Sequence, residues 1–267
     1  MGPSDSHLKI AAALKKGFRS RTRLFGAWLS IGSAEIASIF AAARGDFVGI
    51  DLEHTTISLA DAQAIIRACH QHGRACLPRV YAGDLESMRR LLDAGSDGII
   101  VPQVSTPAHV EMFADHMRYP PDGSRGFGVA AAQLYGRGFQ EYVREANSAL
   151  SLIIQVETVA GVENIDKLLD HPAVDGVMVG PYDLSGSLGV PGKLDAPVVI
   201  EACDRVIQAC ASRRMSCGMH LVYPSAEQIR QHLERKFTFL ILGSDIFNLW
   251  KRSEETDRMI EEFGVGI

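Results

Sequence analysis

The sequence predicts a single (β/α)₈ barrel that takes up all 267 residues. Three observations predict this fold class. Short apolar segments alternate with amphipathic ones eight times, the apolar segments are continuous rather than interrupted by polar residues, and no linker or repeat divides the chain. Continuous apolar strands are typical of parallel sheets covered on both faces, and about 250 residues is the usual size of such a barrel.

The eight expected strands are short apolar runs, most of them followed by polar or charged residues. In chain order they span Leu24–Leu29, Phe47–Leu52, Ala75–Val80, Gly98–Val104, Leu152–Glu157, Gly176–Gly180, Ser216–Leu221 and Thr238–Leu242.

Residues that favour helix ends mark the helices between these strands. Ser58 and Asp61 form a capping-box-like start after the second strand. Asp84 begins the helix that ends at Gly95, and Thr106 precedes a proline at the first helical position. Each strand is therefore followed by a helix, as a barrel requires.

The two ends of the chain and one loop interrupt the regular pattern. The polar start, about residues 1–8, is expected to be frayed, and residues 252–263 predict a final charged helix that is a candidate oligomer contact. Tyr119–Gly128 is an unusually long loop, which in a compact domain is typically functional or disordered. The sequence leaves open whether Arg125 in this loop closes over the site or meets a neighbouring subunit.

Composition argues against several classes of function. The formal net charge is −5 with no block of like charges, which disfavours nucleic acid as a partner. No apolar run approaches the ~18 residues of a membrane span, and no signal peptide is visible. The odd number of cysteines predicts a cytoplasmic protein with reduced core thiols at Cys69, Cys76, Cys203, Cys210 and Cys217.

Polar side chains gather where the expected strands end. Active sites of (β/α)₈ barrels lie at the C-terminal ends of the strands, so these residues are the first candidates for chemistry. In chain order they are Glu53, His54, Arg79, Gln103, Gln155, Glu157, Asp183, His220, Ser244 and Asp245.

Glu157 and Asp183 are the candidate metal ligands. Each carboxylate follows an apolar strand, and two carboxylates leaving neighbouring strands on one side of a sheet can hold one hard divalent cation such as Mg²⁺ or Mn²⁺. The open positions would go to water and a chelating substrate. The alternative is that one or both carboxylates cap a helix N-terminus, where negative charge is favourable.

Arg79 and His54 are the candidate catalytic side chains. The Arg79 guanidinium can pair with a carboxylate or a developing enolate, and the alternative is a structural ion pair. His54 is a candidate general base, with a hydrogen-bonded structural histidine as the alternative. Asp93 is a candidate to orient the His54 imidazole. The role of His220 stays open.

No lysine lies at a strand's C-terminal end. A Schiff-base aldolase needs such a lysine inside the barrel pocket, so imine chemistry is disfavoured. Glycine-rich phosphate loops are also missing from the sequence, so nucleotide binding has no support. The lysines are Lys9, Lys15, Lys16, Lys167, Lys193, Lys236 and Lys251.

Several motifs, in order and at matching spacing, resemble the HpcH/HpaI family of metal-dependent pyruvate aldolases from about Phe25 to Leu249. They are Ile50–His54, Pro78–Arg79, Arg118–Pro121 with Arg125–Gly126, Gln155–Glu157, Gly180–Ser185 and Leu188–Gly192.

This resemblance implies a role for each candidate residue. Glu157 and Asp183 would bind Mg²⁺, Mn²⁺ or Co²⁺, which pyruvate would chelate. Arg79 would stabilise the enolate oxygen, and His54, paired with Asp93, would act as acid and base on the aldol hydroxyl, with a water on the metal as the competing base. Gln155, Gly180 and the backbone amides of Tyr182 and Asp183 would hold the pyruvate.

The resemblance also implies substrates and an assembly. Family members cleave 4-hydroxy-2-oxo acids, including 2-keto-3-deoxy sugar acids, into pyruvate and an aldehyde, and are often hexamers built as trimers of dimers. Leu52 stands where a glycine is common, and Tyr182 where alanine is common. These departures leave the acceptor open. The alternative function is a lyase or synthase of the same fold with another electrophile, such as a citrate synthase or a thioester lyase.

Overall fold

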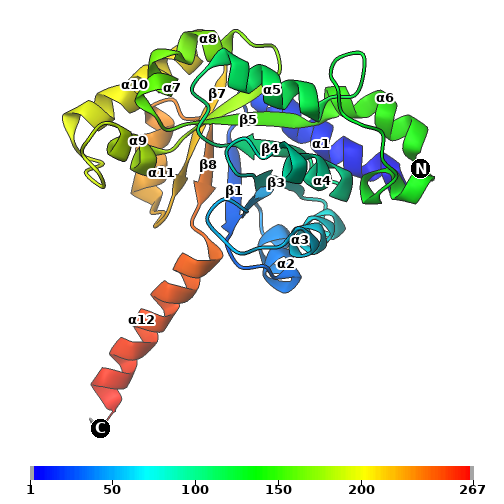
Figure 1. Ribbon diagram of the computed structural model, residues 1–267. Coiled ribbons are helices and arrows are strands. Elements are labelled where there is room, and N and C mark those ends of the chain that lie inside the picture. The colour runs from blue at the N-terminus through cyan, green and yellow to red at the C-terminus, as the bar shows by residue number, and fades with distance from the viewer. Residues whose placement is uncertain (1–2, 265–267) are drawn as a thin grey trace.

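The computed structural model describes residues 3–264, and its eight strands form one closed, all-parallel barrel in the order β1 to β8 (Figure 1). The predicted fold class is therefore confirmed. The strands are β1 (Leu24–Leu29), β2 (Phe47–Asp51), β3 (Ala75–Arg79), β4 (Gly98–Val101), β5 (Ser151–Val156), β6 (Val174–Val179), β7 (Ser216–Leu221) and β8 (Phe239–Leu242).

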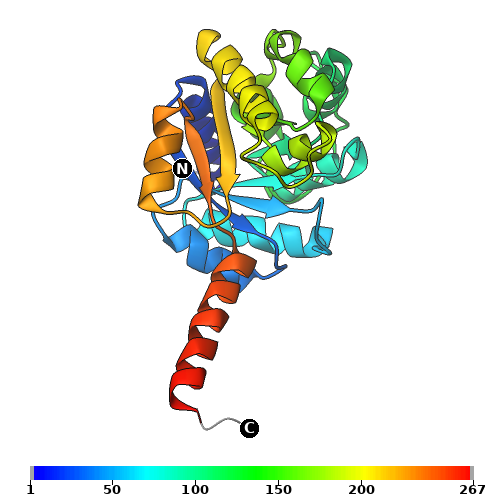
Figure 2. The same cartoon turned by 90° about the vertical axis from the view of Figure 1, so that its left-hand side faces the viewer.

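The helices between α1 and α12 connect successive strands and lie on the outside of the barrel, whereas α1 precedes β1 and α12 follows β8 (Figures 1 and 2). In chain order the helices are α1 (Pro3–Arg19), α2 (Ala34–Ala42), α3 (Leu59–Gln71), α4 (Leu85–Ala94), α5 (Pro107–Met117), η1 (Ala131–Gly136), α6 (Phe139–Ala149), α7 (Val159–Glu163), α8 (Ile165–Leu169), α9 (Pro181–Ser187), α10 (Pro197–Ser212), α11 (Ala226–Glu234) and α12 (Asp245–Phe263). Among these described helices, not one combines the length and apolar character that crossing a membrane requires.

Local capping signals place the helices where the sequence predicts them. Ser58 and Asp61 form a reciprocal capping box at the start of α3. Asp84 accepts a hydrogen bond from the Ser87 backbone at the start of α4, and Gly95 ends that helix with a left-handed φ of 106°. A residue with a Cβ is strained at that φ, so glycine is the residue suited to this helix end.

The start of the chain differs from the expectation. Residues from Pro3 onward form α1, within the segment of about residues 1–8 that the sequence predicts to be frayed, and residues 1 and 2 lie outside the described part. Helix α1 carries Leu14 and Phe18 into the apolar interior of the barrel, and Phe18 packs edge-on against Phe239 of β8 at 5.2 Å between ring centroids. The barrel interior therefore gains a cover at its N-terminal end, which is why this segment is ordered.

Helix α12 extends away from the barrel in both views (Figures 1 and 2). It begins at Asp245, earlier than the expected residue 252, and Asp245 is its one buried member among the described residues. The neighbouring helix α11 has no buried residue. The outer surface beside β8 and β1 thus lacks the helix that usually follows the last strand of such a barrel.

Candidate active site

Arg79 occupies the centre of the C-terminal end of the barrel. It is the last residue of β3 and pairs in register with Asp51 of β2. Its Nη2 lies 2.8 Å from Asp51 Oδ2, and its Nε lies 3.3 Å from Glu53 Oε2. The guanidinium also lies over the Trp28 ring, with Cζ 5.1 Å from the centroid. The predicted structural ion pair is present, and it orients the group rather than removing it from the cavity.

Glu157 follows β5 and is 2% exposed. Its Oε1 accepts a hydrogen bond of 2.7 Å from the Gln103 backbone, and Gln155 Nε2 donates to Oε2. The pKa of Glu157 is raised to about 7, mainly by burial and also by the charges of Asp183 and Glu53, while the two hydrogen bonds oppose the shift. The groups around Glu157 therefore supply too little positive charge to offset the burial of its ionised carboxylate.

Gly180 lets β6 approach Glu157 closely. A Cβ at Gly180 would stand 2.5 Å from Glu157 Oε2 and 3.1 Å from Gln155 Nε2. Gly180 is followed directly by α9, which carries Tyr182 and Asp183 in its first turn. Asp183 is exposed and lines the cavity, although its place in the first turn of α9 also lets its charge interact favourably with the helix N-terminus.

A cavity of about 420 Å³ opens at this end of the barrel. At the inner end it is lined by Arg79, Gln155, Gly180 and Asp183, with His220 of β7 beside them. At the outer end it reaches the connection after β7 and the helices α10 and α11. Its inner end is polar and its walls are largely apolar, which is typical of a site for a small organic substrate.

The charges at the inner end fit a hard divalent cation. Asp51 and Glu53 pair with the guanidinium of Arg79, and the charges of Glu53 and Asp183 act on Glu157, so four carboxylates influence one another at this end of the barrel. Burial raises the pKa of Glu53, as do the charges of Asp51 and Asp183, although Arg79 lowers it. In the part of the chain that the structure describes, no group of three or more His, Cys, Asp or Glu forms a complete metal centre. Glu157 and Asp183 thus offer two oxygen ligands with room for a chelating substrate.

His54 and Asp93 do not meet in one chain. His54 is exposed, with Nε2 3.7 Å from Glu53 Oε2, whereas Asp93 accepts a 2.6 Å hydrogen bond from Arg125. Helix α4 runs back from the end of β3, so Asp93 near its C-terminus lies at the opposite end of the barrel from His54. The expected pairing is therefore wrong within one subunit, and Asp93 can serve His54 only from another copy of the chain.

The long loop after α5 also lies at that opposite end. Arg125 is 2% exposed, pairs with Asp93 and lies over the Tyr119 ring at 4.5 Å. Its guanidinium is buried inside the fold at this end, so the loop does not close over the site of its own subunit. Sequence reasoning could not place the loop because helix direction, and not residue type, decides the end of the barrel at which it lies.

Three residues make contacts at the site that the sequence did not predict. Asp51 and Trp28 both hold Arg79, and the His220 ring packs against Trp28 in a tilted arrangement with ring centroids 5.5 Å apart. Alternation along β1 and β2 is the signal that could have found Trp28 and Asp51, since side chains two apart in a strand share a face. Asp245, by contrast, accepts hydrogen bonds from the Ser30 and Ile31 backbone and is structural.

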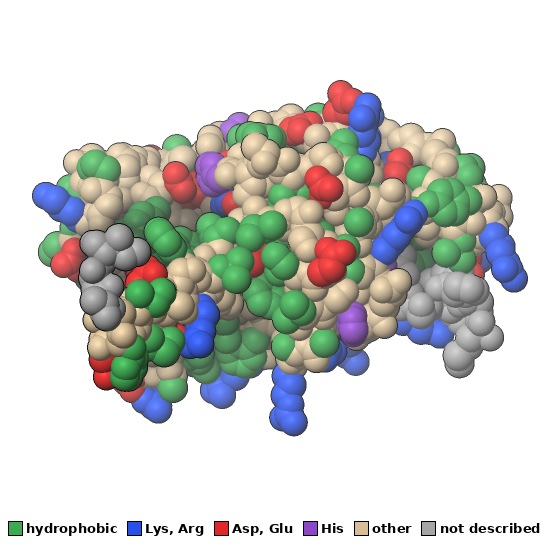
Figure 3. Space-filling view, turned by 90° about the horizontal axis from the view of Figure 1, so that it is seen from below, with side chains coloured by type: hydrophobic (Ala, Val, Ile, Leu, Met, Phe, Trp, Pro, Cys, Tyr) green, Lys and Arg blue, Asp and Glu red, His purple; other side chains and the backbone are tan. Residues whose placement is uncertain are grey.

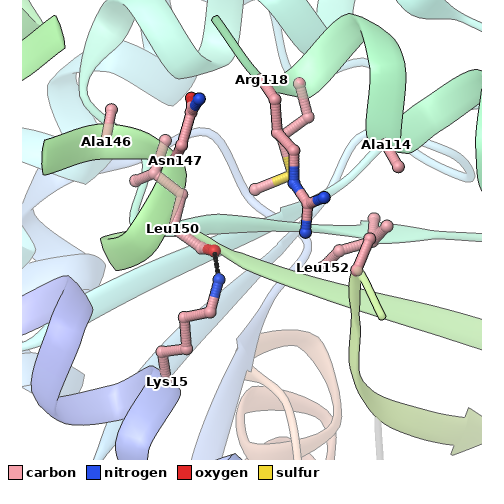
Figure 4. A pocket seen from close by; sticks show the side chains of 9 residues that line it. Lys15, Ala114, Arg118, Ala146, Asn147, Leu150 and Leu152 are labelled. Carbon is pink, nitrogen blue, oxygen red and sulfur yellow. Dashed lines mark hydrogen bonds between the residues drawn. The ribbon is translucent and has the colours of Figure 1, made fainter. Parts of the chain in front are cut away.

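A second, smaller hollow lies at the N-terminal end of β5 and β6 (Figure 4). Burial lowers the pKa of Lys15 there, a property that Schiff-base lysines share. However, Lys15 Nζ donates to the Leu150 carbonyl at 2.7 Å and lies 3.5 Å from Asp175, on the face opposite to the catalytic candidates. The buried lysine therefore has structural partners, which agrees with the sequence-based argument against imine chemistry.

Comparison with known proteins shows the family of this chain. Residues 24–251 match the model of the HpcH/HpaI aldolase/citrate lyase family. The sequence is 34% identical over 211 residues to a 2-keto-3-deoxy-L-rhamnonate aldolase of Salmonella typhi, covering 78% of this chain and 77% of that protein.

Solved structures are also similar to the chain over most of its length. An HpcH/HpaI aldolase/citrate lyase family protein from Burkholderia cenocepacia J2315 superimposes with a TM-score of 0.88 at 28% identity, covering 94% of this chain and 99% of that one. The citrate synthase SbnG superimposes with a TM-score of 0.83 at 25% identity, covering 94% and 98%. With its barrel and the match over most of its length, the chain belongs to the HpcH/HpaI aldolase/citrate lyase family.

Proposed function

We propose that this carbon–carbon lyase is a class II aldolase that reversibly cleaves a 4-hydroxy-2-oxo acid into pyruvate and an aldehyde. The observation that carries the proposal is the group of four mutually interacting carboxylates at the C-terminal end of the barrel, two of which pair with Arg79. Such a site holds a cation and a guanidinium next to each other, and an enolate oxygen needs both kinds of positive charge.

Glu157 and Asp183 are the residues that would hold the divalent cation, Mg²⁺, Mn²⁺ or Co²⁺. When bound, the cation supplies Lewis-acid polarisation of the substrate's 2-oxo group. The raised pKa of Glu157 supports this assignment, since a cation beside it would favour the ionised carboxylate.

The side chains around the cation site divide the reaction between them. Arg79 donates hydrogen bonds to the 2-oxo oxygen, where negative charge develops as the C3–C4 bond breaks. Gln155, with its amide between Arg79 and Glu157, positions the pyruvyl carboxylate together with the Gly180–Asp183 backbone. His54 takes the proton from the C4 hydroxyl as the aldehyde carbonyl forms, and returns a proton in the reverse direction.

A second candidate function is condensation of the same enolate with another electrophile, as in a citrate synthase. The TM-score of 0.83 with the citrate synthase SbnG favours keeping it. The two functions share the pyruvyl half of the site and differ in the acceptor half.

A coupled assay separates these functions. We expect pyruvate release from a panel of 4-hydroxy-2-oxo acids, followed with lactate dehydrogenase, to be lost with EDTA and restored by Mn²⁺. Release of no pyruvate from any member of the panel, together with condensation of a 2-oxo acid with an acyl thioester, would favour the second function.

We further propose that the active protein is a homo-oligomer in which α12 packs against a second copy. Ile246, Leu249, Trp250, Ile260 and Phe263 of α12 are exposed large apolar residues. Figure 3 shows hydrophobic side chains gathered on the face from which α12 extends. An apolar helix face of this size is costly in water, and the outer surface beside α11 of another copy offers a matching gap. A hexamer, as a trimer of dimers, is the assembly we propose for it.

A further inference from the structure

His220 is an inward-facing histidine of β7 that has no part in the chemistry proposed above. Its ring packs at a tilt against Trp28, and the charges of Arg79 and Asp51 act on its pKa, so it faces the same part of the barrel. It lines the cavity beside Arg79 and Gln155. The question is what its ring offers to a ligand there.

One hydrogen bond determines which ring nitrogen of His220 carries the proton. Nε2 lies 3.0 Å from the carbonyl oxygen of Gly243. A carbonyl oxygen accepts and never donates, so Nε2 carries the hydrogen and Nδ1 keeps a free lone pair. Burial lowers the pKa of His220 to about 4, with Arg79 adding to the effect, so the ring is neutral at physiological pH.

The Nδ1 lone pair is available to a ligand. Within residues 3–264, no side chain or backbone group donates a hydrogen bond to it. It is also not among the fully enclosed polar atoms that lack a partner, so it is open to the cavity. An acceptor that stands without a donor on the wall of a cavity fits a ligand that brings the donor.

The charges along the cavity restrict the kind of donor. Apart from Arg79, the cationic group on the cavity wall is Arg235, whose Nη2 lies 2.7 Å from Asp204. His232 at the outer end bonds the Gln228 carbonyl through Nδ1. A carboxylate at the far end of the substrate would therefore find no unpaired cation among these residues, and its negative charge would face the lone pair of His220. A hydroxyl could instead donate a hydrogen bond to that lone pair.

We propose that His220 Nδ1 accepts a hydrogen bond from a hydroxyl of the aldehyde half of the substrate and so selects hydroxylated aldehydes. The inference rests on the proposed aldolase function. Arg79 and His220 both contact the Trp28 ring, at 5.1 and 5.5 Å from its centroid. Both residues also line the same cavity, so a carbon chain whose 2-oxo group lies at Arg79 can extend along it to His220.

The test is the preference between two acceptors that differ by one hydroxyl, lactaldehyde and propanal, in addition to pyruvate. His220→Gln keeps an N–H for the Gly243 carbonyl and lacks the Nδ1 acceptor. We expect its ratio of kcat/KM for lactaldehyde over propanal to fall about tenfold, the size of one neutral hydrogen bond. His220→Asn, whose amide oxygen can take the place of Nδ1, should restore most of the ratio.

His116→Gln is the matched control, because the His116 ring also donates to a backbone carbonyl, Met112 O at 2.9 Å, but lies on α5 outside the cavity. Its ratio should equal that of the wild type. An unchanged ratio in His220→Gln, with both aldehydes still consumed, overturns the role of His220 and leaves the aldolase function standing. An equal fall of both rates with a lower Tm shows a structural role and also overturns it. If the wild-type enzyme neither adds an aldehyde nor exchanges the methyl protons of pyruvate, the proposed function fails and this inference fails with it.

Discussion

Arg79 and Asp51 form a two-point ion pair across adjacent strands. Arg79 Nε lies 3.2 Å from Asp51 Oδ1, and Nη2 lies 2.8 Å from Oδ2. The two residues are register partners, so the pairing of β2 with β3 itself sets the plane of the guanidinium. One edge of the group is held by Asp51, its face lies over Trp28, and Nη1 is left facing Gln155 at 3.5 Å. That remaining edge is the part of Arg79 available to a substrate oxygen.

Asp51→Asn should lower kcat about 10- to 100-fold, because an amide cannot hold the guanidinium through two charge-assisted hydrogen bonds and small losses of alignment are costly. Pyruvate release at saturating substrate measures the change. The control is Asp166→Asn, which removes the same kind of partner from Arg213 at the surface. A kcat within twofold of the wild type would show that Arg79 does not depend on Asp51.

Asp183→Asn should weaken Mn²⁺ binding at least about tenfold and leave the Tm of the metal-free protein unchanged. Asp183 is exposed in the first turn of α9, so its charge contributes little to folding, while a carboxylate ligand is worth much more than an amide to a hard cation. Titration of Mn²⁺ by calorimetry checks this. Asp195→Asn is a control with an exposed carboxylate nearby. Equal Mn²⁺ affinity in Asp183→Asn and the wild type would remove Asp183 from the site.

Glu157 should make the metal-free protein less stable as the pH rises. Burial raises the pKa of Glu157 to about 7, so the folded state holds this proton more tightly than the unfolded state does. The two states are equally protonated below about pH 4.5, and the cost of ionising the buried group grows to about 3 kcal/mol by about pH 7. Added Mn²⁺ should reverse the loss at pH 7 to 8, where the ligand is ionised.

The comparison that isolates this effect is the Tm of EDTA-treated wild type minus that of Glu157→Gln, measured from pH 4.5 to 8. The Tm of the wild type should fall relative to that of Glu157→Gln as the pH rises, because glutamine does not titrate. A difference that does not change with pH would mean that Glu157 is already ionised at low pH without a cation.

Replacing Trp250 by glutamate should shift the assembly toward smaller species. Trp250 is 62% exposed on α12, and burying it in a neighbour would contribute about 1.5–3 kcal/mol for each contact. Sedimentation velocity measures the change, with Lys251→Glu as the control for charge. If the wild-type protein is a monomer at micromolar concentration, or if Trp250→Glu leaves the assembly intact, α12 is not the contact.

Features set by nearby residues could be predicted from the sequence. The cap at Ser58 and Asp61, the left-handed Gly95 and the apolar core of each strand depend on neighbours within a few positions, and the structure confirms them. The strand ends were less certain. The expected strand Gly98–Val104 stops at Val101, because Pro102 has no N–H to donate to a ladder.

Features that depend on the direction of a helix or on a contact with a distant part of the chain could not be predicted. The placement of Asp93 and Arg125 at the end opposite to His54 follows from helix α4 and α5 running back along the barrel, and no residue type signals it. The position of α1 depends on the packing of Phe18 in the barrel interior. The importance of Asp51 depends on its register with Arg79. Each of these depends on a partner far along the chain.

The central claim is that Glu157 and Asp183 hold a cation that makes the methyl protons of pyruvate labile. Proton exchange of pyruvate in D₂O, followed by NMR, tests it without any assumption about the aldehyde. We predict exchange with Mn²⁺-loaded protein, loss of exchange with EDTA, and loss in Asp183→Asn at the same Mn²⁺ concentration. Exchange that continues in EDTA, or that is absent from the Mn²⁺-loaded wild type, would contradict the account.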